Sequence, residues 1–495
     1  MSRRVLNGFA WSAGGSLVSV VVLLGYTAAT ARLVEPASFG RYALACTAST
    51  LFGYVANAGL ATCLLRADRL TRPLVRAAST VGAATGLGCA AAIQVVALVL
   101  APFADAETVR LVQLLGVQLL VQPLGGALLA ALRRAGRARQ AALLDTAGQA
   151  LGCATGLVLL AAGWSPWGLA AAAPVASLTV LAGVVLSGAL RSLPGGPPVP
   201  ARELLGQSGF FAGYGIVQSA TNNAPLWCAA ALFGPAATGW FSRASLATGI
   251  PLTALAQGLQ RAAAPELAEA RARNGGRLPR RAAHDLLCAT SGAGFLGFGA
   301  VAATGPDWLL VLLGPGWEGA ARLLPALALG AACALLCSTG NSLDQIRRAP
   351  GASVASQAAV IAGTVVLLAL AAATGSLTVL ALASTAPAFG HALQLRHWSA
   401  GAVLAAGPLL RAHAVHAVLG LALFAAGRGV HSLWTLPGQP LARACLSTAA
   451  VLACAAACLP LRRRIPAVRA VLTRGASAAT PPHQEPVCAS ASPAR

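Results

Sequence analysis

The stretch LVEPASFGRYALA, residues 33–45, returns in outline as LFGPAATGWFSRASLA, residues 232–247. Five positions match at a constant offset of 199 residues, namely Leu33, Pro36, Ala37, Gly40 and Tyr42 with Leu232, Pro235, Ala236, Gly239 and Phe241. Each copy ends one long apolar run and begins the next one. The pattern predicts a duplicated helical bundle whose two copies have the same orientation in a membrane.

The composition of the chain indicates an all-α polytopic membrane protein. Of its 495 residues, 57% are hydrophobic and only 10% are charged, whereas a soluble domain averages about 25% charged residues. Apolar runs long enough to cross a hydrocarbon layer of about 30 Å recur along almost the whole length. The short alternating segments of an outer-membrane barrel do not occur in the sequence.

Fourteen apolar runs, bounded by charge, proline and glycine, are predicted to be transmembrane helices. They lie near residues 9–31, 40–61, 77–101, 109–131, 141–162, 167–190, 207–231, 239–260, 284–304, 319–340, 352–373, 376–395, 404–427 and 441–461. The duplication divides them into two pseudo-symmetric six-helix bundles, residues 1–202 and 203–396. Two additional helices follow in residues 397–464, and residues 465–495 are expected to form a disordered cytoplasmic tail.

The arginines predict the orientation of the chain. The net charge is +22, and all 35 basic residues are arginine. With an even number of spans and the N-terminus inside, 28 of the 35 fall in cytoplasmic segments, as the positive-inside rule requires. We therefore expect a multi-pass protein of the plasma (cell inner) membrane with both termini in the cytoplasm. The same pattern accounts for the positive charge without nucleic acid, through contact with anionic lipids.

Sequence motifs of enzymes and of metal sites do not occur in this chain. A Walker motif, GxSxG, HExxH and zinc-ligand spacings are all missing, and the twelve cysteines lie mostly inside apolar runs as small packing residues. Asp105 and Glu107 are a weak match to the acidic pairs of membrane glycosyltransferases. We predict no enzymatic activity, no metal and no cofactor, and an integral-membrane glycosyltransferase remains a minor alternative.

Three stretches carry a resemblance to a known family. They are GFAWSAGGSLVSV with the residues that follow it to Ala45, residues 232–270 with the Gly-Pro turn and the Phe-Ser-x-Ala helix, and LLGPGWEGAARLLPALAL at residues 312–329. Together they resemble the polysaccharide biosynthesis, or lipid-linked oligosaccharide flippase, family of the multidrug/oligosaccharidyl-lipid/polysaccharide exporter superfamily. The resemblance implies two six-helix bundles arranged in a V, with two extra helices in some branches, and transport by alternating access.

The resemblance also implies the partners. The expected substrate is a lipid-linked (pyrophosphate) oligosaccharide or a polysaccharide precursor, and membrane lipids surround the protein. Glycosyltransferases or a polymerase of the same pathway are further expected partners, and the protein is expected to act as a monomer. A MATE-like exporter of drugs or metabolites is the main alternative, although the first span has no acidic residue of the kind that cation exporters tend to carry.

Three arginines are candidates for binding a phosphate group, because the guanidinium donates two parallel hydrogen bonds and keeps its charge. Arg32 ends the first span, Arg41 begins the second and Arg243 lies near the start of the eighth. We predict that they form a cationic rim on a cavity between the two bundles. The alternative is interfacial anchoring at the headgroups, or a local ion pair of Arg32 with Glu35.

Polar residues of the seventh span, Gln218, Asn222 and Asn223, are predicted to hydrogen-bond either sugar or a neighbouring helix. Ala224 and Pro225 stand where many relatives of the flippase family carry charge. Structural ion pairs are expected for Glu107 with Arg110, for Glu318 with Arg322, and for Asp145 and Asp344 with the arginine clusters beside them.

Overall fold

The computed structural model describes residues 18, 20–57, 60–66, 70–102, 105–188, 190, 193–197, 200–275, 277–347, 349–401, 404–433, 439–458 and 466–467. Helices and short connectors make up this part of the chain, which contains no β-strand. The predicted cytoplasmic N-terminus and most of the predicted disordered tail, residues 465–495, lie outside the described residues. The all-α class predicted from the composition is confirmed.

Helices follow one another along the chain with short connectors. A first helix covers Val20–Leu33. It is followed by α2 (Pro36–Asn57), α3 (Leu60–Arg66), α4 (Arg72–Leu100), α5 (Ala106–Val117), η1 (Gln118–Leu120), α6 (Gln122–Arg134), α7 (Ala138–Ala161), α8 (Trp167–Leu186), α9 (Ala201–Arg273), α10 (Arg280–Leu313), α11 (Glu318–Ile346), α12 (Pro350–Thr374), α13 (Leu377–Leu382), η2 (Ala383–Thr385), α14 (Pro387–Ala400), α15 (Ala406–Leu433) and α16 (Pro440–Ala457).

The helix α9 consists of two limbs joined at Gly234. This glycine has φ 80° and ψ −178°, which is not a helical conformation, and a positive φ is readily adopted only by glycine. The first limb ends before Gly234 and the second begins at Pro235, whose fixed φ suits the first position of a helix. The two limbs correspond to the predicted seventh and eighth spans.

The described helices agree with a polytopic membrane protein. Each of the fourteen predicted ranges overlaps a helix, a limb of α9 or a consecutive pair of short helices. Nine helices of the described part are long and apolar enough to cross a membrane by themselves, for example α4 and α11. The division into twelve spans plus two remains a prediction.

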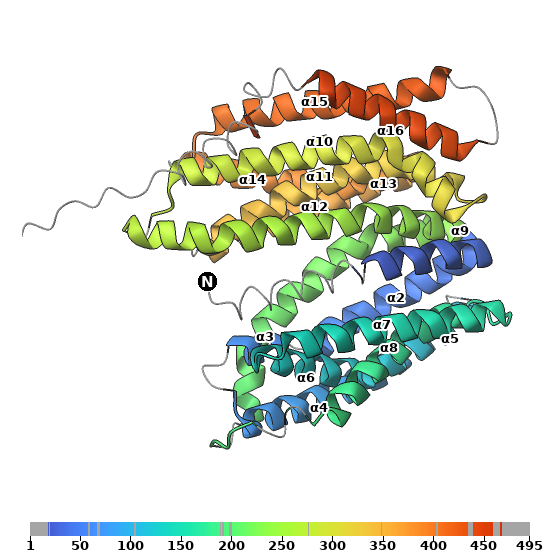
Figure 1. The fold of residues 1–495 in the computed structure, drawn as a ribbon, viewed down its shortest axis with the longest axis vertical. Helices are drawn as coiled ribbons and strands as arrows, with labels where there is room; N and C mark the ends of the chain where they lie inside the picture. The colour runs from blue at the N-terminus through green and yellow to red at the C-terminus, as the bar shows by residue number, and fades with distance from the viewer. Residues whose placement is uncertain are drawn as a thin grey trace, which may run out of the picture.

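The helices form two groups that converge at one end and diverge at the other (Figure 1). The first group contains α2 to α8, and the second contains the second limb of α9 and α10 to α16, with α15 and α16 packed on the outer side of α10. The first limb of α9 crosses between the groups. The Gly234 break and the α10–α11 turn lie at the convergent end, and the α9–α10 connector lies at the divergent end.

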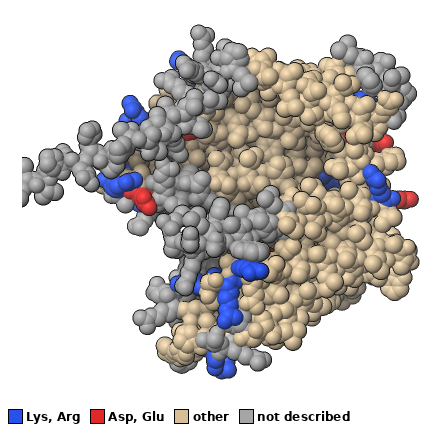
Figure 2. Space-filling model, viewed as in Figure 1, with Lys and Arg blue, Asp and Glu red and all other residues tan. Residues whose placement is uncertain are grey.

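Charged side chains concentrate near the two ends of the molecule, as Figure 2 shows for one face. Between these ends the visible surface is mostly uncharged. Such a band is the surface that a hydrocarbon layer requires, because a charged side chain at the bilayer centre is costly. The face is hollowed between the two groups of helices.

Candidate substrate-binding cavity

The two groups of helices are joined at the convergent end by a reciprocal contact, which we call the closing seam. Gly40 of α2 lies against the backbone carbonyl of Pro235, and Gly239 of α9 lies against the backbone carbonyl of Pro36. A β-carbon at either glycine would overlap the opposite carbonyl oxygen. These are the four residues that the internal repeat relates by an offset of 199, so the repeat marks the place where the halves meet.

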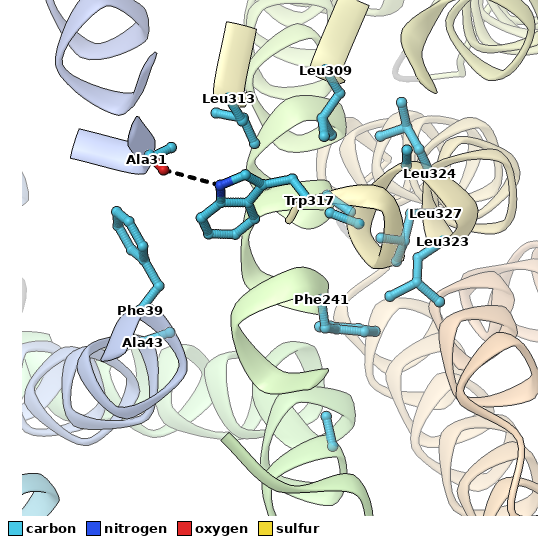
Figure 3. Packing of buried hydrophobic residues seen from close by; sticks show 14 of the residues in the cluster. Ala31, Phe39, Ala43, Phe241, Leu309, Leu313, Trp317, Leu323, Leu324 and Leu327 are labelled. Atoms are coloured by element: carbon cyan, nitrogen blue, oxygen red, sulfur yellow. Dashed lines mark hydrogen bonds between the residues drawn. The ribbon is translucent and has the colours of Figure 1, made fainter. Parts of the chain in front are cut away.

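An aromatic cluster closes the same end of the molecule (Figure 3). The buried Trp317 donates from its indole nitrogen to the carbonyl of Ala31 at 3.1 Å, and its ring meets that of Phe39 edge-on with centroids 5.4 Å apart. Both rings are fully buried, at 1% and 0% exposure. The hydrogen bond joins the N-terminal end of α11 to the first helix, and the ring contact joins it to α2, so the closed end is held by packing and by a directed polar contact.

The central cavity lies beside this seal, between the two groups of helices. It has a volume of about 760 Å³ and is lined by the first helix, by α2 and by both limbs of α9. Its polar lining includes Thr47, Thr50, Asn222, Asn223 and Gln257. Within the described lining, one residue carries a full charge, and that residue is Arg243.

The guanidinium of Arg243 lies on an aromatic face and has no counter-ion among the described residues. Its Cζ lies 4.0 Å from the centre of the Phe39 ring, which is a cation–π contact. None of the described carboxylates pairs with it. Its Nε is buried without a hydrogen-bond partner, as are the hydroxyls of Tyr26 and Thr27, two further lining residues. Buried polar atoms left unpaired cost free energy, so this end of the cavity is suited to a polar ligand.

A second cavity of about 530 Å³ lies between the first limb of α9 and the second group of helices. Its lining includes Gln218, Ser338, Asn341 and Gln357. Asn222, together with Ser245 and Gln257 and three other residues, lines both cavities, so they share a wall along α9.

The predicted polar residues of the seventh span therefore face cavities. Asn222 lines both, Gln218 lines the second, and Asn223 lines the central one. The amide nitrogen of Asn223 also donates to the carbonyl of Ser219, one helical turn earlier, at 2.8 Å. This bond stays within α9, so the choice between contact with sugar and contact with a neighbouring helix remains a prediction for these three residues.

The three candidate arginines lie in different surroundings. Arg243 lines the central cavity, whereas Arg41 forms ion pairs with Asp105 at 3.2 Å and with Glu107 at 3.0 Å. Arg32 is exposed at the convergent end and donates to the carbonyl of Val311 at 3.1 Å. The structure thus brings one of the three to the cavity and gives the other two contacts that join helices.

The ion pairs differ in part from the sequence expectation. Glu107 pairs with Arg41 on α2 instead of Arg110 on its own helix, because the N-terminus of α5 lies beside α2. The pairing of Asp145 with Arg133 at 3.0 Å agrees with the prediction, and so does the pairing of the fully buried Asp344 with Arg347 at 3.1 Å.

Sequence reasoning missed Phe39, Tyr26 and Thr27 as parts of the site. Phe39 lies inside the repeated motif, but its partner at the 199-residue offset is Thr238, so the repeat does not single it out. Tyr26 and Thr27 begin the polar part of the helix Val20–Leu33, which continues with Thr30 and Arg32 after an apolar first half. Two adjacent polar residues inside a membrane span could have predicted that this part of the helix lines a cavity.

Comparisons with known proteins identify a matching family and solved structures of similar fold. The family profile described as polysaccharide biosynthesis protein matches residues 29–322. No curated protein matches the sequence. The structure is similar to a lipid II flippase MurJ in an inward closed conformation, with a TM-score of 0.64 at 10% identity over 90% of this chain and 98% of that one.

Two transporters of the MOP superfamily have the same fold. One is a multidrug resistance MATE family transporter in an inward-facing conformation, with a TM-score of 0.59 at 12% identity over 79% of this chain and 96% of that one. The other comes from Pyrococcus furiosus Vc1 and is described as having a binding pocket of reverse polarity. Its TM-score is 0.53 at 12% identity over 85% of this chain and 96% of that one.

Proposed function

Because the chain belongs to the polysaccharide biosynthesis protein family, we propose that it is a flippase that moves a lipid-linked oligosaccharide or a polysaccharide precursor across the plasma membrane. The observation that carries the proposal is the unpaired guanidinium of Arg243 in a central cavity whose described lining contains no carboxylate. An anionic headgroup supplies the missing counter-charge. An exported organic cation would instead meet a like charge in a low-dielectric site.

The cavity chemistry suits a diphosphate-linked sugar. Arg243 binds a phosphate oxygen pair through its planar fork. The side chains of Asn222 and Asn223 donate to and accept from sugar hydroxyls in the central cavity, and Gln218 does so in the second cavity. The apolar lipid tail stays in the bilayer, so only the polar head has to be enclosed.

Transport in this proposal requires two arrangements of the halves, one closed at the convergent end and one open there. The described state is closed at the convergent end by the closing seam and by Trp317. We assign residues 1–202 and 203–396 as the two moving bodies and residues 397–464 as the additional pair of helices. The head loads from the divergent, cytoplasmic end, and separation of the halves at the seam releases it on the other side. The protein acts as a monomer and makes or breaks no covalent bond of its substrate.

The partners in this scheme are enzymes of one pathway. Glycosyltransferases build the lipid-linked precursor on the cytoplasmic side, and a polymerase or a further transferase consumes it after transport. Neighbouring genes for such enzymes, together with loss of an extracellular polysaccharide in a deletion strain, support the proposal. Increased drug sensitivity in the same strain, with normal polysaccharide, contradicts it.

A reconstituted assay tests the role of Arg243. Purified protein in vesicles is given a fluorescent polyprenyl-diphosphate sugar, and the label that reaches the second leaflet is followed with time. Arg243→Gln is expected to lower the rate about tenfold to hundredfold, the equivalent of one charge-assisted contact. Arg243→Lys keeps the charge and loses the planar fork of the guanidinium. Its transport rate is therefore expected to lie between those of the unmodified protein and of Arg243→Gln.

A matched control separates the cavity charge from charge in general. Arg322 is an exposed arginine at the start of α11, and Arg322→Gln removes the same charge outside the central cavity. Its transport rate is expected to stay within about twofold of the unmodified protein. Equal rates for Arg243→Gln and the unmodified protein would exclude Arg243 from substrate binding.

A further inference from the structure

A continuous line of polar side chains crosses the second group of helices, away from the central cavity. His416 Nδ1 lies 3.0 Å from Ser291 Oγ, and the same Oγ lies 2.8 Å from His413 Nδ1. The Nε2 atoms of His413 and His391 are 3.2 Å apart, and His391 Nδ1 lies 3.1 Å from Gln394 Oε1. The line connects α15, α10 and α14, and we call it the histidine chain.

Each end of the histidine chain is hydrogen-bonded, directly or through Gln394, to a backbone group that acts either as a donor only or as an acceptor only. At one end the backbone N–H of Ala467 donates to His416 Nε2 at 3.2 Å. At the other end Gln394 Nε2 donates to the carbonyl of Cys337 at 3.2 Å and to Asn341 Oδ1 at 2.8 Å. A backbone carbonyl only accepts and a backbone N–H only donates, so each end constrains the chain independently.

The constraints admit one arrangement of protons with all three rings neutral. The amide nitrogen of Gln394 faces the Cys337 carbonyl, so its oxygen accepts a proton from His391 Nδ1. His391 Nε2 then accepts from His413 Nε2, and His413 Nδ1 accepts from the Ser291 hydroxyl.

At the His416 end the same arrangement agrees with the second constraint, which is the donating backbone N–H of Ala467. The Ser291 oxygen accepts from His416 Nδ1, which leaves His416 Nε2 free to accept from the backbone of Ala467. The protons assigned from the Gln394 end therefore leave His416 Nε2 as an acceptor, as the Ala467 N–H requires. Every ring nitrogen is used once, and all hydrogen bonds point in one direction.

Four members of the histidine chain are buried, and His413 is half-buried. His391, Gln394, Ser291 and His416 are 6%, 1%, 0% and 0% exposed. The helices packed around them carry these titratable side chains: Arg280, Arg281, His284, Asp285, Cys288 and Asp307 of α10, Glu318, Arg322, Cys333, Cys337 and Asp344 of α11, Arg396 and His397 of α14, Arg411 and Arg428 of α15, and Arg443, Cys445, Cys454 and Cys458 of α16. From α12, Ser356 contacts Gln394. Asp344 is paired with Arg347 and accepts from Trp398, and Asp285 lies beside His284. No described carboxylate contacts a ring of the chain, so a proton bound there adds an uncompensated charge.

We propose that the histidine chain is a proton relay that takes up one proton at His416 and holds it at His391. A proton bonds to His416 Nε2 in place of the Ala467 contact, and His416 Nδ1 gives its proton to Ser291 Oγ. Ser291 passes its own hydroxyl proton to His413 Nδ1, and His413 passes its Nε2 proton to His391 Nε2. Each intermediate group loses one proton and gains one, so the net product is a single imidazolium at His391.

The relay ends beside the second cavity. His391 donates to Gln394, which contacts Asn341, and Asn341 lines that cavity. The two cavities share a wall along α9, so a positive charge at His391 and the anionic head bound in the central cavity attract each other across that wall, and by linkage each strengthens the binding of the other by the same factor. This last step rests on the proposed function, because it needs an anionic substrate; the relay itself does not.

Nitrogen NMR of the full chain, with ¹⁵N-histidine in lipid nanodiscs, tests the relay directly. At neutral pH the expected tautomers are Nδ1–H for His391, Nε2–H for His413 and Nδ1–H for His416. Acidification is expected to add one proton to the group, at His391. Any other tautomer pattern, or first protonation at His416 or at His413, overturns the proposal.

The path is tested by proton uptake after a rapid acid jump, read with a pH-indicator dye on purified protein. Ser291→Ala removes one hop and is expected to slow uptake at least about tenfold, the effect of about 1.4 kcal/mol on the barrier. Ser291→Thr keeps the hydroxyl and is expected to be normal. His397→Gln, on the exposed side of α14, is the control for an unrelated histidine.

The outcomes separate the relay from the proposed function. Unchanged uptake in Ser291→Ala overturns the relay whatever the lipid assay shows. Failure of lipid transport with the expected tautomers and uptake contradicts the flippase and leaves the relay intact. If Ser291→Ala does not fold, the tautomers of the unmodified protein decide alone.

Discussion

Replacing Gly40 by alanine is expected to open the convergent end of the protein. The added β-carbon would overlap the carbonyl oxygen of Pro235, which belongs to the backbone and has no rotamer by which to move away. The two helices must part by roughly an ångström before the methyl group fits. In the proposed transport cycle the halves open by separation of the same helices, so the substitution is expected to disfavour the closed arrangement selectively.

The magnitude follows from the cost of overpacking. An extra methyl group in a packed contact costs about 1–3 kcal/mol, and this cost falls on the closed state alone. At about 1.4 kcal/mol for each tenfold change, the ratio of open to closed molecules rises by a factor of about 5 to 150. Gly239→Ala is expected to have the same effect, since it meets Pro36 in the reciprocal contact. The double variant is expected to fall short of the sum, because both methyl groups act on one seam.

A native cysteine reports the opening. Cys46 lines the central cavity, and a membrane-impermeant maleimide added from the outer side reaches it only when the seam is open. Mass spectrometry of the Cys46 peptide is expected to show labelling of Gly40→Ala at least about fivefold faster than of the unmodified protein, following the shift in population. Gly249→Ala is the control, since this glycine lies on α9, as Gly239 does, and lines the cavity that contains Cys46, but a β-carbon there meets nothing within 4 Å.

Unchanged labelling of Cys46 in Gly40→Ala would refute the reasoning, provided that the variant is folded by its thermal unfolding temperature. It would mean that the Pro235 carbonyl yields without opening the cavity. Equally fast labelling in Gly249→Ala would also refute it, because the effect would then come from helix propensity and not from the seam.

Further substitutions test the contacts around the cavity. Arg41→Gln is expected to lower the free energy of unfolding by at most about 1 kcal/mol in a thermal unfolding assay, because Arg41 is partly exposed. Lipid transport is expected to stay unchanged, because Arg41 is already paired with two carboxylates. A loss of transport similar to that of Arg243→Gln would show instead that Arg41 binds substrate. Trp317→Phe removes the hydrogen bond to Ala31 and is expected to cost about 1 kcal/mol, with faster labelling of Cys46. Asp344→Ala leaves the side chains of Arg347 and Trp398 without their shared acceptor, and a loss of about 3–5 kcal/mol is expected from thermal unfolding.

The fold could be predicted from sequence because its determinants are local. Apolar runs of the length of a bilayer, bounded by arginine, proline and glycine, predict helices one by one. The repeated motif at residues 33–45 and 232–247 further predicted that the two halves are alike. What it did not predict is that Gly40 and Gly239 touch the opposite prolines. The contact depends on how two helices cross, and sequence spacing carries no information on that angle.

The site was predicted in part for the same reason. Arg32, Arg41 and Arg243 look equivalent in sequence, since each lies at the outer end of a span. Their difference comes from distant residues: the carboxylates that pair with Arg41 lie more than sixty positions later, and the carbonyl that binds Arg32 lies on α10. Arg243 remained without such a partner, and a missing partner can be recognised only once the neighbours are known.

The internal repeat is preserved at the closing seam and is absent at the proposed ligand site. A two-fold axis makes every contact occur twice with the roles exchanged, and the closing seam has this property. The 199-residue offset relates Arg243 to Leu44, however, and the Phe39 ring beneath it to Thr238. A second arginine at residue 44 would place two like charges in one cavity of low dielectric, which costs free energy whenever the substrate is absent. In the proposed cycle a single cation binds the phosphate head and still allows its release, so the symmetric seam and the asymmetric charge would serve the same transport.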